Sequence, residues 1–155
     1  MKFESLPHGV RLAVEAAQQK KAAGITVIDL TKAGAFTECF VICTGFSTPQ
    51  VQAICTEIEE QLYKHLRRSP EHREGHRSAE WALLDFGGFV VHVFSEHARH
   101  YYDLERLWRS SPMLVIPGED EGTSSAHTAS AAAFAHEQLS AEATSRRPHG
   151  SRSRR

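Results

Sequence analysis

Residues 80–108 decide the fold of this chain, because they hold two strand patterns, a tight turn and a helix pattern in unbroken order. Residues 81–86 read WALLDF, residues 87–88 are a glycine pair, and residues 89–94 read FVVHVF. Two apolar runs separated by two glycines are typical of a β-hairpin. A helix pattern follows directly, so the sequence predicts a hairpin that leads into a helix.

This third helix of the chain carries aromatic side chains on its apolar stripe. Ser95 is its expected N-cap, with Glu96 favourably placed in the first turn, and the sequence SSP at 110–112 should end it. The stripe comprises Ala98, Tyr101, Leu104 and Trp108. We expect Leu104 and Trp108 to pack on the sheet. Two i, i+4 ion pairs are expected on the helix surface, Arg99 with Asp103 and Glu105 with Arg109.

The residues before and after the hairpin complete an α/β pattern. Thr48 is the expected N-cap of the second helix, with Pro49 at its first position, and Gly24 is the expected C-cap of the first. The order of elements predicts a mixed β-sheet with flanking helices. The expected elements are a helix over about 7–23, strands over 25–30 and 39–43, a helix over 49–66, an exposed loop over 67–78 and an edge strand over 113–116.

Length and composition indicate one globular domain with a polar tail. The chain has 155 residues, is 41% apolar and 24% charged, and has a formal net charge of −1, so no global field draws it to nucleic acid or an anionic membrane. No apolar run reaches the roughly 20 residues of a membrane span, and the N-terminus has no secretory pattern. Three cysteines suggest no disulfide framework and favour a reducing cytoplasm.

The composition changes after Pro117, which sets the expected domain at 1–117. Residues 118–155 are rich in Ala, Ser, Gly, Thr and Arg, and we expect them to form a disordered tail. Weak, non-specific RNA contact by the tail and a solvated tail without a dedicated function are equally good interpretations. The RNA interpretation rests on the five terminal arginines, Arg146, Arg147, Arg152, Arg154 and Arg155.

An enzymatic alternative comes from the turn between the second strand and the second helix. Nucleotidyltransferases hold phosphate at a Gly-Ser turn of this kind, and Gly45 and Ser47 stand there. They also need paired carboxylates on the following strand for divalent metal, but only Asp85 is available and Leu83 is not an acid. Turn geometry and helix capping are therefore the favoured roles, and neither catalytic residues nor a cofactor or metal site is expected.

The histidines and cysteines also favour structural roles. Two histidine pairs have helical spacing, but Gly75 argues against a helix at the first, and no zinc-type cysteine pattern exists. His92 lies in a strand pattern between two valines, and a structural hydrogen bond is expected for it. Cys39 and Cys43 fall on one strand face and are expected to be buried free thiols.

The block at 81–108 resembles the ribosomal silencing factor family, also called Iojap-like. Members carry a Trp strand ending in Leu-Asp-Tyr-Gly-Asp, a Val-Val-His-Val-Phe strand and a Tyr-x-Leu-Glu-x-Leu-Trp helix. Further matches are the sequence ECFVICTG at 38–45, Ser47 followed by Gln50 and Val51, and Glu74-Gly75. Two positions depart from the pattern: Gly88 replaces an acid and Glu38 replaces Asp.

The resemblance implies a nucleotidyltransferase-like shape and a function in binding rather than catalysis. Members bind the large ribosomal subunit through its protein number fourteen, block joining with the small subunit and so repress translation, and many are homodimers. Aromatic side chains beside carboxylates suit a basic protein patch. By matching position, five residues are expected to form the partner-binding surface: Trp81, Asp85, Tyr101, Tyr102 and Glu105.

Overall fold

The computed structural model of the protein describes residues 1–118. By internal contacts the chain divides into Met1–Thr123 and Ser124–Arg155, so all described residues belong to the first unit. The terminal arginines and the expected disorder of the tail lie outside the described residues. The domain boundary after Pro117 stays a prediction.

The predicted mixed sheet is confirmed, and it has six strands in the order β3-β4-β5-β2-β1-β6. The central strands β5 and β2 run parallel, and all other neighbours run antiparallel. The hairpin of β4 and β5 is confirmed, with Gly87 at a φ of +84° in the turn. The strands are β1 (Ala23–Asp29), β2 (Cys39–Gly45), β3 (His72–Glu74), β4 (Trp81–Asp85), β5 (Phe89–Ser95) and β6 (Met113–Val115).

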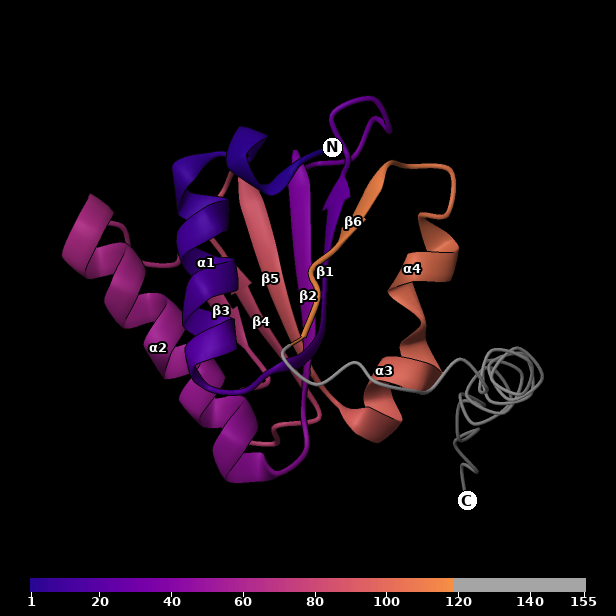
Figure 1. Ribbon diagram of the computed structural model, residues 1–155. Helices are drawn as coiled ribbons and strands as arrows, with labels where there is room; N and C mark the ends of the chain where they lie inside the picture. The colour runs from indigo at the N-terminus through magenta and orange to yellow at the C-terminus, as the bar shows by residue number, and fades with distance from the viewer. Residues whose placement is uncertain (119–155) are drawn as a thin grey trace, which may run out of the picture. The chain divides into compact units, whose positions relative to one another are not determined.

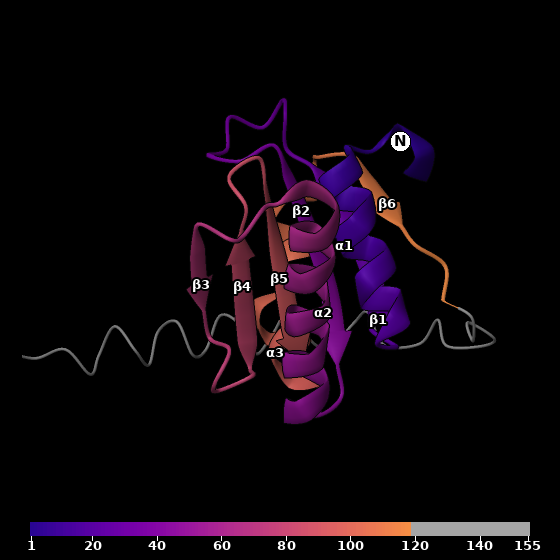
Figure 2. The same ribbon diagram turned by 90° about the vertical axis from the view of Figure 1, so that its left-hand side faces the viewer.

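Helices cover the two faces of this sheet unequally. After a short 3-10 turn (Phe3–Ser5), helices α1 (His8–Gln19) and α2 (Thr48–Leu66) lie side by side on one face (Figures 1 and 2). The short helices α3 (Glu96–Tyr102) and α4 (Leu104–Leu107) lie on the other. We call these the α1–α2 face and the α3–α4 face. Each has its own buried cluster, and the α1–α2 cluster is much the larger.

Close packing of α2 on the sheet depends on Gly45 at the end of β2. A Cβ atom there would lie 2.8 Å from Val51 Cγ2 and 3.1 Å from its backbone nitrogen. The N-cap of α2 is Ser47 and not Thr48, because the Ser47 side chain accepts a hydrogen bond from the Gln50 backbone at 3.1 Å. Both findings agree with the structural roles favoured for Gly45 and Ser47.

The prediction of one helix after the hairpin is wrong in its second half. Ser95 caps α3 as predicted, but α3 ends where Asp103 adopts a left-handed φ of 44°, and α4 starts in a new direction. Asp tolerates this conformation better than most residues. Because the helix is broken, neither expected i, i+4 pair is formed, and Arg99 pairs with Glu105 instead.

The elements around the first helix and before the hairpin also differ from prediction. Helix α1 ends at Gln19, and Gly24, the expected cap, lies inside β1 at a φ of +56°. Strand β3 lies within the predicted loop and pairs with β4. Beyond it, Gly75 has a φ of +73°, and a Cβ atom there would meet the Trp81 carbonyl oxygen at 1.9 Å. This glycine therefore permits the close return of the chain to β4.

Candidate partner-binding surface

Strand β4 directs alternate side chains to the α3–α4 face of the sheet. Trp81, Leu83 and Asp85 share this face because successive side chains on a strand alternate. Their partners on β5 are Phe94, His92 and Val90, of which Phe94 and Val90 belong to the α3–α4 cluster. All three β4 side chains are half-buried. Helices α3 and α4 therefore leave part of this face accessible along β4.

Three of the five predicted residues meet at the start of β4. The Trp81 and Tyr102 ring centroids are 4.5 Å apart, and those of Tyr101 and Tyr102 are 4.9 Å apart with nearly perpendicular planes. Tyr102 remains 48% exposed. We call these three residues the aromatic cluster. It joins a strand and a helix through one tilted and one edge-to-face contact, and it remains open to solvent.

A hydrogen bond to the buried His92 orients the indole of Trp81. Trp81 Nε1 donates a hydrogen bond to His92 Nδ1 at 3.0 Å. Burial lowers the pKa of His92 to about 4, so the imidazole is neutral at pH 7 and can accept this bond. The structural hydrogen bond predicted for His92 is confirmed, although the sequence did not identify Trp81 as its partner.

Asp85 lies at the other end of β4 and does not contact the aromatic cluster. It is four positions from Trp81, which corresponds to about 13 Å along an extended strand. One of its oxygens, Oδ1, accepts a hydrogen bond from the Gly87 backbone at 2.8 Å and so stabilises the hairpin turn.

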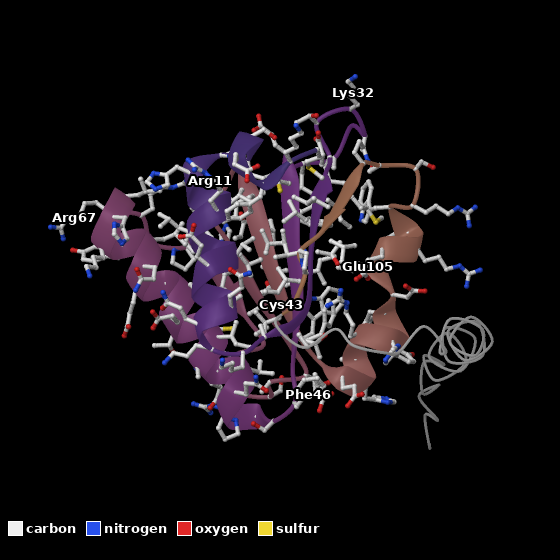
Figure 3. The ribbon with its side chains drawn as sticks, viewed as in Figure 1. Arg11, Lys32, Cys43, Phe46, Arg67 and Glu105 are labelled. Atoms are coloured by element: carbon white, nitrogen blue, oxygen red, sulfur yellow. The ribbon has the colours of Figure 1, made fainter. Side chains whose placement is uncertain are left out.

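Glu105 is engaged within the protein by an ion pair. Its carboxylate accepts a bond from Arg99 Nε at 2.7 Å and a second from Nη2 of the same guanidinium. Arg99 also donates to Thr44 Oγ1 at 3.1 Å and to the Gly24 carbonyl at 2.8 Å. This clasp joins α3, α4, β2 and β1. Figure 3 places Glu105 on the α3–α4 side of the sheet, across from α1 and α2.

Two aromatic residues that the sequence did not assign to a site, Phe36 and Trp108, extend this surface around the buried ring of Phe40. The Phe40 ring lies 4.5 Å from His92 and 5.9 Å from Trp108, and Phe36 lies 6.5 Å from Phe40. Phe36 is 81% exposed, and half-buried Trp108 packs on the α3–α4 cluster as expected. Phe40 and Trp108 matched the family pattern, but Phe36, in an irregular loop, offered no periodic signal.

The residues that a nucleotidyltransferase would need do not form one site. Gly45 pairs with Ser95 at one end of β5, whereas Asp85 pairs with Val90 near its other end. The five-residue offset corresponds to about 16 Å. Gly45 packs closely against Val51, and Asp85 accepts a hydrogen bond from the Gly87 backbone, so each has a structural role where it lies. The register therefore gives this alternative no single catalytic centre.

Cys39 and Cys43 are buried free thiols, as predicted, and so is Cys55. Cys39, Cys43 and Cys55 all lie in the α1–α2 cluster. Burial raises the pKa of each thiol to about 12. Figure 3 shows Cys43 inside the molecule. A thiol with such a pKa is not a nucleophile at neutral pH.

A cavity of about 330 Å³ lies at the N-terminal ends of the parallel strands β2 and β5. Its walls include Leu6 and Phe89, and its polar groups include Asp29, Glu38 and Arg68. Hydrogen bonds from Thr31 lower the pKa of Asp29. None of the five predicted site residues lines this cavity.

Within residues 1–118, none of the helices combines the length and apolar character needed to cross a bilayer.

Comparison with known proteins identifies the family of this chain. The family model described as "Ribosomal silencing factor during starvation" matches residues 4–147. Proteins named ribosomal silencing factor RsfS from Bacillus subtilis and Halalkalibacterium halodurans are 38% and 36% identical, over 69% and 70% of this chain and 90% and 92% of theirs.

The fold is also shared with a solved structure. A crystal structure of a Chromobacterium violaceum protein superposes with a TM-score of 0.64 at 29% identity, and the match covers 83% of this chain and 98% of that one. The family model covers most of the chain, and both curated relatives are matched over nearly their whole length. This chain belongs to the ribosomal silencing factor (Iojap-like) family, whose role is regulatory and associated with the ribosome.

Proposed function

We propose that this protein binds the large ribosomal subunit through its protein number fourteen and blocks joining with the small subunit. The proposed outcome is repression of translation in the cytoplasm. The observation that carries the proposal is the open aromatic cluster of Trp81, Tyr101 and Tyr102 on the α3–α4 face. Interfaces are enriched in Tyr and Trp because these rings bury a large area and lose little conformational entropy.

Charge on this face indicates a basic partner. Exposed Glu80 adjoins Trp81 and accepts a hydrogen bond from Ser95 at 3.0 Å, and Asp85 lies two positions beyond Leu83 on the same face. Carboxylates around an aromatic centre favour a protein patch rich in Lys and Arg and repel phosphate. Glu105 contributes by holding α4 in place through Arg99, and its half-buried carboxylate borders the same face.

The proposal is tested by pelleting the purified protein with isolated large and small subunits, followed by a subunit-joining assay. We expect co-pelleting with large subunits alone and fewer joined ribosomes. Reconstitution with purified protein number fourteen then tests the named partner. Absence of binding to either subunit would contradict the proposal.

Matched tyrosines locate the binding face. Tyr102→Ala, on the α3–α4 face, should weaken large-subunit binding by a factor of about 10 to 30. Tyr63→Ala is the control, because Tyr63 is 52% exposed, against 48% for Tyr102, but belongs to α2 on the other side of the sheet. The double variant Trp81→Ala with Asp85→Lys should lose about 2 kcal/mol or more of binding free energy. Unchanged affinity in a folded double variant would rule out this face.

Two further parts of the proposal have separate tests. Removal of residues 146–155 should leave most large-subunit binding intact, whereas a protein that binds RNA through its arginines would lose it.

A homodimer is also proposed, and sedimentation velocity over a concentration series measures it. A mass of one chain at all concentrations would exclude the dimer without affecting the ribosome-binding proposal.

A further inference from the structure

His92 is a polar side chain buried among aromatic rings, a position where an unpaired polar atom lowers stability. It is only 4% exposed and is surrounded by the rings of Phe40, Phe94 and Trp81. Its Nδ1 accepts the indole N–H of Trp81 at 3.0 Å. Its Nε2 is buried and has no hydrogen-bond partner within residues 1–118. One ring nitrogen therefore has a bond and the other has none.

The tautomer follows from the donor. An indole nitrogen can only donate, so His92 Nδ1 must be unprotonated and Nε2 must carry the proton of the neutral ring. That N–H group is buried without an acceptor, which lowers stability. A carbon ring of similar shape would pack against Phe40 without this cost. The bond to Trp81 is therefore the one polar contact that distinguishes His92 from an apolar residue.

We propose that His92 is a positioning residue for partner binding, which acts by fixing the Trp81 indole in the orientation that the aromatic cluster presents. This inference rests on the proposed function. Trp81 is half-buried, so without its acceptor the indole N–H could turn to water and the ring could adopt other rotamers. The bond holds the ring 4.5 Å from Tyr102 before the partner arrives. Preorganisation of this kind lowers the entropic cost of association.

Two substitutions of His92 separate positioning from general support of the fold. His92→Phe keeps a ring and removes both nitrogens. His92→Asn places an amide oxygen near the Nδ1 position and retains an acceptor. His92→Phe should weaken large-subunit binding by a factor of about 2 to 10 while the protein stays at least as stable to urea at pH 7. His92→Asn should bind more tightly than His92→Phe, even though it is the less stable of the two.

A double-mutant cycle shows whether His92 acts through Trp81. In a Trp81→Phe background the indole donor is absent, so His92→Phe should cause no further loss of binding. An equal loss in both backgrounds would overturn the inference. A loss of binding matched by a proportional loss of stability would also overturn it, because His92 would then serve only the fold.

The indole N–H resonance of Trp81 gives a readout in the free protein. The chain has two tryptophans, and Trp108→Phe assigns the two signals. His92→Phe should move the Trp81 signal and change its contacts to Tyr102, and His92→Asn should largely restore them. Unchanged signals would overturn the inference whatever the binding data. If the wild-type protein fails to bind large subunits, the proposed function falls, and this resonance alone decides whether His92 holds Trp81.

Discussion

The two faces of the sheet are covered by different helices and different kinds of side chain. On the α1–α2 face, two long helices bury small and aliphatic side chains such as Ala13, Val14 and Ile54 at 0% exposure. On the α3–α4 face, two short helices of seven and four residues cover a smaller cluster. The second face contains the buried His92, the Arg99 clasp and the half-buried side chains along β4.

The difference indicates that one face of the sheet mainly stabilises the fold and that the other mainly serves the proposed binding. Apolar burial stabilises in proportion to the area removed from water, so the α1–α2 face supplies most of the folding free energy. The α3–α4 face retains polar groups and exposed rings that contribute less to stability. Binding surfaces commonly give up stability in this way. Truncations on the first face should therefore act on folding, and truncations of the exposed rings and half-buried β4 side chains on the second should act chiefly on binding.

The largest expected effect compares one leucine from each face. Leu62→Ala, a fully buried residue of α2 in the α1–α2 cluster, should lower the free energy of unfolding by about 2–5 kcal/mol, because it leaves a cavity. Leu83→Ala, half-buried on β4, should cost about 1 kcal/mol but weaken large-subunit binding. Urea titration and subunit pelleting measure the two quantities. Equal stability losses, or normal binding by Leu83→Ala, would contradict this difference between the faces.

Acid should destabilise the protein through His92. Burial lowers the pKa of His92 from 6.5 to about 4, so between these values the unfolded chain binds a proton that the folded protein does not. This proton-linked loss of stability is absent above pH 6.5 and grows as the pH falls towards 4. The total is about 3 kcal/mol. Urea titration at pH 7 and 4.5 should show a smaller loss for His92→Phe than for wild type, and an equal loss would refute the assignment.

The Arg99 clasp should matter more than an ion pair of similar chemistry on the surface. Arg99 and Glu105 side chains are 14% and 25% exposed, and Arg99 has two further partners. Arg99→Met should cost about 1–3 kcal/mol of stability and loosen α4. Arg73→Met is the control, because Arg73 is 57% exposed in its pair with Glu59, and below about 1 kcal/mol is expected. Equal costs in thermal unfolding would show that the clasp adds nothing.

What the sequence predicted well was local or periodic. The hairpin, its glycine turn and the apolar stripes of the long helices follow from spacing alone, and these features established the mixed sheet. Strand β3 was missed because all three of its residues are exposed and none is apolar, so its pairing with β4 has no hydrophobic signal. The break at Asp103 was missed because a left-handed residue other than glycine has no distinctive local pattern.

The candidate site was predictable only in part, because side chains are brought together by register. The contact of Trp81 with Tyr102 depends on the pairing of β4 with β5, which sets Trp81 opposite Phe94 and so near the helix that follows β5. Glu105 pairs with Arg99 six positions earlier, a spacing that a continuous helix would not bring together. The hydrogen bond of His92 was expected, but its donor lies on another strand.

The smallest expected effect restores an acid to the hairpin. Gly88 is exposed, has no positive φ, and a Cβ atom there would have no heavy atom within 4 Å. Gly88→Asp, the acid usual in the family, should therefore change stability by less than about 0.5 kcal/mol. If the partner patch is basic, large-subunit association should become about two to five times faster at low salt, and the gain should fade as salt screens it. Gln18→Glu adds the same charge at an exposed position near the C-terminal end of α1, whereas Gly88 lies beside the N-terminal end of that helix. An equal gain from Gln18→Glu would mean that net charge, and not the position of the acid on the hairpin, sets the association rate.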